Sequence, residues 1–272
     1  MRRIRSAFSP LVSRLLWPCL MAFGLTACAG VQAPSSSDAD LPTASDQTDT
    51  QRRAALRTEL AAAYLAAGLP LVALDEVKQA LRIDPRLTQA LNVRGLAYAA
   101  LGDPRRAQDS LEQALDSAPG DPASLHNLAW FHCQQGQFPQ ALAAFDQVLA
   151  QLRGPSASRT LLARGVCESR AGRMEAAVRA LQSSLDHDPS NSAAAINLAA
   201  VLEQQGRLQL AAVHARRVNG DRAARNPESL WLGARIERRL GHEAAAQALL
   251  ETLHNRFPQS PQALAVTQGS AP

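Results

Sequence analysis

Apolar residues recur at helical spacing along residues 54–258, in stretches of about fourteen residues that each end at a glycine. This pattern returns at intervals of 34, 34, 36, 34 and 35 residues, and an alanine always lies five residues after the glycine. The glycines are Gly68, Gly102, Gly136, Gly172, Gly206 and Gly241, and the alanines are Ala73, Ala107, Ala141, Ala177, Ala211 and Ala246. Glycine adopts the left-handed backbone that ends a helix, and alanine lets two helices approach closely. The pattern therefore predicts six helical hairpins, each with a helix A and a helix B.

Two further positions support this reading, if the residues of each repeat are numbered as columns from its first residue. Column eight, in helix A, is always small: Ala61, Gly95, Ala129, Gly165, Ala199 and, in the last repeat, either Gly233 or Ala234. A proline follows helix B in four repeats, at Pro85, Pro119, Pro189 and Pro258. Because proline cannot continue the hydrogen-bond ladder of a helix, we expect each hairpin to end at a fixed place.

The repeats resemble the tetratricopeptide repeat family, with Tyr64 and Tyr98 at column eleven and apolar residues at column twenty-four. The column-twenty-four residues are Val77, Leu111, Phe145, Leu181 and Leu250. The resemblance covers some 205 residues and implies an all-α fold, a right-handed superhelix of six helix-turn-helix hairpins. Within residues 52–258 the expected repeats are about 54–87, 88–121, 122–157, 158–191, 192–226 and 227–258.

Two junctions depart from the pattern. The third repeat lacks the terminal proline and runs through Arg153-Gly154-Pro155, and the fifth ends in Asn219-Gly220. Both departures are compatible with simple loop variation, which costs little free energy, and with contacts to a partner.

The first residues have the features of an export signal. Arg2 to Arg5 form a basic stretch, and residues 15–27 are uncharged and largely apolar but too few to span a bilayer. They lead into Leu25-Thr26-Ala27-Cys28, which looks like a bacterial lipobox and predicts a signal peptide at 1–27 and lipid on Cys28. The alternatives are an ordinary signal peptide with an incidental cysteine, or a short buried helix.

The residue after Cys28 is Ala29 and not aspartate, which in similar lipoproteins implies sorting to the outer membrane, at its periplasmic face. Residues 28–51 are rich in Ser, Thr, Asp, Gln and Pro, so we expect a lipidated, flexible linker there, and a tail at 259–272.

Composition and charge narrow the choice of partner. Aromatic residues make up only 4% of the chain, while Ala and Leu dominate the apolar content, which suits closely packed helices. The net charge of +4 falls to zero once the four arginines of the signal segment are removed, because 24 basic residues then face 24 acidic ones. We therefore expect no nucleic-acid partner, since such binding needs a concentrated basic face.

Columns two, five, nine and twelve of helix A share one face, which should line the inner wall of the superhelix. In the first two repeats these residues are Ala55, Thr58, Ala62, Leu65, Gln89, Asn92, Leu96 and Ala99. Because they are small and mildly apolar, they suit an apolar partner segment, extended or helical, rather than the acidic chaperone terminus that some tetratricopeptide proteins clamp with basic residues. The alternative is that they pack against the neighbouring helix.

Cys133 and Cys167 would be the only cysteines left beside Cys28 after processing. An exported chain meets an oxidising compartment, and the two cysteines fall on adjacent helices A, so a disulfide is expected; two buried thiols are the alternative. A zinc site that uses His126 or His132 with them is a weaker option. No phosphate-binding loop, nucleophile elbow or metalloprotease motif occurs in the sequence, which predicts no enzyme, no cofactor and no small-molecule substrate.

A narrower resemblance is to the type IV pilus biogenesis and stability lipoproteins, the PilF/PilW-type pilotins. The similar segments are residues 127–136 (NLAWFHCQQG), Gly165-Val166-Cys167, residues 228–233 (ESLWLG) and Phe257-Pro258. The resemblance implies an outer-membrane lipoprotein scaffold that binds the secretin subunit of the type IV pilus and promotes its localisation and multimerisation. The alternatives are another periplasmic lipoprotein of this architecture, an adaptor for peptidoglycan enzymes or proteases, and, more remotely, an enzyme.

Overall fold

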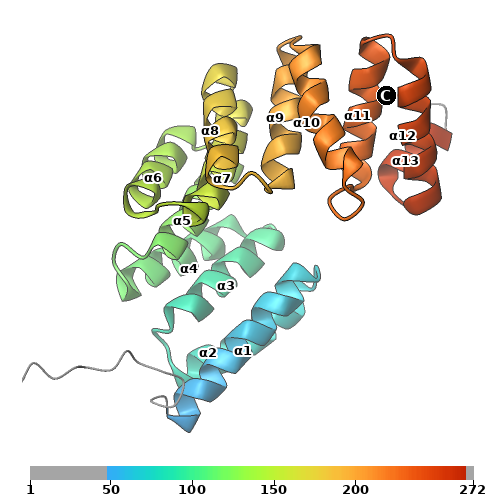
Figure 1. Cartoon of the computed structure of the whole chain (residues 1–272). Coiled ribbons are helices and arrows are strands. Elements are labelled where there is room, and N and C mark those ends of the chain that lie inside the picture. The colour runs from blue at the N-terminus through green and yellow to red at the C-terminus, as the bar shows by residue number, and fades with distance from the viewer. Residues whose placement is uncertain (1–47, 268–272) are drawn as a thin grey trace, which may run out of the picture. The chain divides into compact units, whose positions relative to one another are not determined.

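The computed structural model describes residues 48–267, and this part of the chain contains thirteen α-helices and no strand (Figure 1). The helices are α1 (Asp49–Ala66), α2 (Pro70–Ile83), α3 (Thr88–Ala100), α4 (Pro104–Ser117), α5 (Pro122–Gln134), α6 (Phe138–Gln151), α7 (Pro155–Arg170), α8 (Met174–His187), α9 (Ser192–Gln204), α10 (Leu208–Gly220), α11 (Pro227–Arg239), α12 (Glu243–Arg256) and α13 (Pro261–Thr267). The predicted all-α tetratricopeptide fold is confirmed. Cys28, which is the predicted lipid site, the predicted signal peptide and most of the predicted linker lie outside the described residues.

The hairpin turns form for the reason that the sequence suggests. All six repeating glycines have φ between +73° and +79°, the left-handed region that only glycine enters without strain. The residue after each glycine donates its backbone N–H to a carbonyl five residues earlier, as Leu69 does to Tyr64 at 2.9 Å and Asp103 does to Tyr98 at 3.0 Å. These bonds satisfy carbonyls at the end of helix A and reverse the chain into helix B.

The two helices of a hairpin touch at column eight. A Cβ atom added to Gly95 would lie 2.6 Å from Leu111 Cγ, and one added to Gly165 would lie 2.6 Å from Leu181 Cγ. In the last repeat Ala234 takes this place and is fully buried against Leu250. Small residues at column eight are therefore required by the column-twenty-four side chain that crosses above them.

Successive repeats pack through both sets of helices. Each helix B contacts the next helix A, and the odd-numbered helices also contact one another in succession, from α1 to α13. Polar side chains join neighbouring odd helices: Asn92 donates to Ser124 Oγ at 2.7 Å, and Asn127 donates to Asn92 Oδ1 at 3.2 Å. The odd helices thus form a continuous row.

The structure adds helical residues to the two predicted flanks. The expected linker runs to residue 51, but α1 begins at Asp49, because Thr48 and Gln51 form a reciprocal capping box. The expected tail at 259–272 contains α13, which starts after Ser260, whose hydroxyl accepts from the N–H of Ala263. The third junction differs too: α7 begins at Pro155, three residues before the expected start of the fourth repeat, after Gly154 with φ of +60°. No helix among residues 48–267 is both long and apolar enough to cross a membrane.

Candidate partner-binding site

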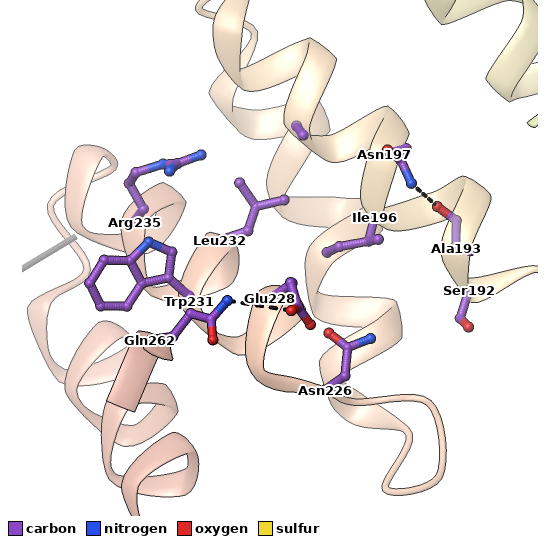
Figure 2. Close-up of a pocket in the computed structure, with 11 residues that line it drawn as sticks. Ser192, Ala193, Ile196, Asn197, Asn226, Glu228, Trp231, Leu232, Arg235 and Gln262 are labelled. Atoms are coloured by element: carbon purple, nitrogen blue, oxygen red, sulfur yellow. Dashed lines mark hydrogen bonds between the residues drawn. The ribbon is translucent and has the colours of Figure 1, made fainter. Parts of the chain in front are cut away.

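The row of odd helices carries two adjoining hollows. The first, of about 400 Å³, lies over α3, α5, α7 and α9, and its lining includes Leu96, His126, Trp130, Arg159, Leu162 and Val166. The second, of about 460 Å³, lies over α9, α11 and α13, and its lining includes Ile196, Asn226, Glu228, Trp231, Leu232, Arg235 and Gln262 (Figure 2). Asn197 lines both hollows, so they form one surface that is large enough to take an extended polypeptide segment.

The predicted inner face in the first two repeats is only partly available to a partner. Leu96 lines the first hollow, and Ala62 and Gln89 are exposed, whereas Ala55, Leu65 and Ala99 are half-buried. Leu65 packs against the core between the first two hairpins.

Thr58 and Asn92 require a correction, because they are only 4% and 6% exposed and cannot meet a partner. The Thr58 hydroxyl donates to the carbonyl of Ala54 in its own helix, at 2.9 Å, and Asn92 is consumed by its bonds to the next helix of the row. The short polar side chains of Thr58 and Asn92 are therefore buried. For these two residues the alternative prediction, packing against the neighbouring helix, is the one that the structure supports.

The same columns account for the hollows further along the chain. Column five supplies His126, Leu162, Ile196 and Trp231, and column nine supplies Trp130, Val166, Ala200 and Arg235. The predicted face is therefore the one that carries the hollows, but the prediction named its residues only in the first two repeats. The signal that was missed is size: these columns carry two tryptophans, Trp130 and Trp231, only in the later repeats.

His126 makes the first hollow neutral on its α5 side. Its ring lies edge-on to Phe145, with centroids 5.9 Å apart, and its Nδ1 is 3.0 Å from Thr160 Oγ1. Burial, together with the charge of Arg159, lowers the pKa of His126 to about 4. The ring is therefore uncharged at neutral pH and adds to the apolar wall formed by Leu96, Leu162 and Trp130.

The second hollow has a charged edge held in a fixed geometry. Arg235 donates from Nε and Nη2 to the two oxygens of Glu203, at 2.8 and 2.6 Å, and Arg239 donates to the same carboxylate at 3.2 Å. Burial alone would raise the pKa of Glu203, but the hydrogen bonds and charges of Arg235 and Arg239 outweigh burial and hold that pKa below its ordinary value. Figure 2 shows Gln262 of α13 beside Glu228 of α11, joined by a 3.4 Å hydrogen bond that closes the other side.

Repeat one presents a further apolar surface that the column reasoning did not identify. Its large exposed side chains are Leu56, Leu60, Leu69, Leu71 and Val72, the first of which is 57% exposed. Column three, which Leu56 occupies, is fully buried in the other five repeats because the preceding hairpin covers it. The sequence signal for this surface is Leu56, a large apolar residue in the first repeat at the column that contacts the preceding hairpin in later repeats.

Cys133 and Cys167 form a disulfide in the structure, between α5 and α7, with Cα atoms 5.7 Å apart. Both are buried, beside Phe145 and Ala141. The bridge joins the third and fourth repeats, the two that the departing loop also connects. Within residues 48–267 there is no group of three or more His, Cys, Asp or Glu side chains arranged to hold a metal ion.

Comparisons with known proteins agree with the fold. Two family models, both described as tetratricopeptide repeat, match residues 98–165 and 168–227. No curated protein sequence matches the chain significantly.

Among solved structures, the chain is similar to PilW, a type IV pilus biogenesis factor, with 27% identity and a TM-score of 0.68 over 79% of this chain and 98% of PilW. It has the same fold as PilF of Pseudomonas aeruginosa, with 19% identity and a TM-score of 0.64 over 82% of this chain and all of the other. Cut9, from the APC/C hetero-tetramer Cut9–Hcn1, gives 15% identity and a TM-score of 0.66 over 81% of this chain and 43% of that one, which again shows the fold alone. The chain is thus an array of tetratricopeptide repeats with structural similarity to type IV pilus proteins.

Proposed function

We propose that this protein is an outer-membrane lipoprotein scaffold that binds the secretin subunit of the type IV pilus and promotes its localisation and multimerisation. The observation that carries the proposal is the similarity to PilW, which extends over nearly the whole of that protein at 27% identity. The segments that resemble the pilotin family fall on structurally distinct parts of the array: residues 127–136 on α5 and its turn, and residues 228–233 on α11.

The surfaces described above are suited to holding a polypeptide and not a small substrate. The row of odd helices offers two apolar hollows whose polar groups are at the edges, which is the usual arrangement for an extended peptide. Repeat one adds exposed leucines close to residue 48, the described residue nearest to the proposed lipid on Cys28. In this proposal the acyl chains hold the scaffold at the periplasmic face of the outer membrane while the array grips an apolar secretin segment.

Capture from a detergent extract tests the partner. The full chain carrying an affinity tag should retain the secretin as the dominant protein, and the double variant Ala62→Glu/Leu96→Glu should reduce the captured secretin at least tenfold, because two carboxylates would enter an apolar contact. Leu65 is left unchanged because it supports the core. Leu264→Glu is the matched control, since Leu264 is an exposed leucine on α13, 44% exposed, away from both altered positions.

Localisation is tested separately. Cys28→Ser should leave the repeats folded, since the residue precedes them, but should remove the lipid and leave the secretin outside the outer-membrane fraction. A peptidoglycan enzyme or protease in the eluate in place of a secretin would overturn the pilus assignment and favour an adaptor role.

A further inference from the structure

A third hollow, of about 400 Å³, lies between α10, α11 and α12 and shares no residue with the two hollows on the odd helices. Its lining is mostly small, with Ala215, Gly220, Gly233, Ala245 and Ala248 among the contributing residues. Leu249 and Thr252 of α12 complete one wall, and Asn219, Arg216, Arg225 and Glu237 supply the polar groups. It goes beyond the proposed function, because no part of the secretin-binding surface is involved.

The hollow is wide because repeat six has no side chain at column seven. In repeat two this column is Arg94, which crosses to helix B and donates to Ser110 Oγ at 3.0 Å and to Gln113 at 2.8 Å. In repeat four it is Arg164, which bonds Asp146 at 3.0 Å. The corresponding hollow in repeat four, which Arg164 lines, holds about 210 Å³, against about 400 Å³ in repeat six, where Gly233 adds no side chain.

Gly233 is required by a polar side chain and not by the close approach of its own hairpin. A Cβ atom at this position would lie 2.5 Å from Asn219 Nδ2. That nitrogen donates to the carbonyl of Ser229 at 2.8 Å, so Asn219 is held rigidly across the floor of the hollow. The unusual Asn219-Gly220 junction and Gly233 are thus parts of one local arrangement.

Two polar atoms in this arrangement have no partner within the described chain. Asn219 is 7% exposed, and its Oδ1 accepts no hydrogen bond. The Nε of Arg225 is buried and donates to nothing, and residues 48–267 provide no ion pair for this guanidinium. Such groups are rare in folded proteins, because burying them without a partner costs free energy.

Arg216, the other arginine of the hollow, does have a carboxylate partner. Arg216 donates from Nε and Nη2 to Glu237 at 2.6 and 2.7 Å, and Nδ1 of His242 lies 2.8 Å from the same carboxylate. The hydrogen bond from Arg216, against burial, lowers the pKa of Glu237, and this carboxylate therefore stays charged and neutralises Arg216. Arg225 is left as the unneutralised cation of the hollow.

We propose that the third hollow binds the carboxyl-terminal residue of a polypeptide, with the terminal carboxylate on Arg225 and the terminal backbone N–H donated to Asn219 Oδ1. The guanidinium calls for an anion that accepts from two parallel N–H groups, which a carboxylate does. The unsatisfied oxygen of Asn219 calls for a donor beside that anion, which a phosphate or an acidic side chain alone lacks. The small walls formed by Gly233, Ala245 and Ala248 suit a small aliphatic terminal side chain.

Peptide binding to the full chain in detergent micelles tests this site. Fluorescein-labelled hexapeptides, randomised at the first five positions and ending in Ala or Val, are compared by anisotropy as free acids and as amides. The free acids should bind, and amidation should weaken binding at least tenfold. Arg225→Met should cause a similar loss, while Arg222→Met, which removes an exposed arginine three residues earlier, should change affinity less than twofold.

A second variant tests the site without altering its charge. Ala248→Trp should fill the hollow and abolish binding, whereas Ala143→Trp, at the same exposed column of repeat three, should not. Failure of every free-acid peptide to bind, equal binding of acids and amides, or equal affinity of Arg225→Met and Arg222→Met would overturn the proposal. None of these outcomes depends on whether the secretin is captured.

Discussion

The two ends of the array are finished differently. At the carboxyl end α13 covers the last hairpin: Ala263 is 1% exposed and packs with Leu230, Ala234 and Leu250. At the amino end no described residue covers the outer face of α1, and Leu56, Leu60 and Ala63 occupy columns that are partly or fully buried in later repeats but exposed here. Repeat arrays need closed ends for solubility, so an apolar open end indicates either a weak point or a contact surface.

Removing the disulfide should cause the largest loss of stability. The bridge links the amino half of the array, whose end is open, to the carboxyl half, whose end α13 covers. The double variant Cys133→Ser/Cys167→Ser loses a link that closes a loop of about 35 residues, worth about 3–4 kcal/mol of unfolding free energy. We expect urea unfolding to split into two steps, with repeats one to three unfolding first.

Reduction provides the control for that experiment. Dithiothreitol should reproduce the loss in the native chain and have no effect on the double variant. In urea without reductant, the two proteins should show the same number of reactive thiols; two additional thiols in the native chain would mean that the bridge does not form.

A matched pair of charged substitutions tests the difference between the ends directly. Ala263→Glu places a carboxylate in the contact under α13 and should lower the free energy of unfolding by about 3 kcal/mol. Ala63→Glu places the same group on the open face of α1 and should change it by less than about 0.5 kcal/mol. Urea denaturation followed by circular dichroism measures both, and a large loss for Ala63→Glu would show that the open face is covered in solution.

Acid should destabilise the middle of the array through His126. The pKa of His126 falls from 6.5 to about 4 on folding, so the unfolded chain binds the proton more readily between these values. Stability should therefore fall by roughly 2–3 kcal/mol as the pH drops from 6.5 to 4. Glu203 and Glu237, in the last two repeats, have lowered pKa values, and their contribution is lost only as the pH falls below about 4.5 through those values.

The variant His126→Gln separates the two effects. It keeps a polar side chain that can reach Thr160 but does not titrate, so the decline between pH 6.5 and 4 should flatten while the loss at lower pH remains. Thermal melts across pH 3.5 to 7.5 measure this, with His187→Gln on the exposed end of α8 as the control. An unchanged decline would mean that another group titrates in this range.

The repeat architecture could be predicted because it rests on local rules. Six glycines at helix ends and small residues at column eight each have one physical cause, and the structure confirms both in the positive φ of Gly68 and the contact of Gly95 with Leu111. The face that carries the hollows also follows from the helical period alone.

What escaped prediction depends on residues far apart in the sequence. The helix α13 has only seven residues and is stabilised by docking, so its own pattern is too short to indicate it. The burial of Asn92 depends on Ser124 and Asn127, and the ion pairs of Glu203 depend on arginines more than thirty residues later. The role of Gly233 depends on Asn219 from the preceding repeat.

The smallest expected change in stability gives the most direct test of what the open end is for. Leu60 and Leu264 are 41% and 44% exposed and lie on the first and last helices, so Leu60→Glu and Leu264→Glu should each alter unfolding by no more than about 0.5 kcal/mol. If the open face of α1 contacts the secretin, Leu60→Glu should nevertheless lower the captured secretin at least fivefold, and Leu264→Glu should not. Equal capture by both variants would show that the open face of α1 does not contact the secretin, and would confine the contact to the face of the odd helices that carries the hollows.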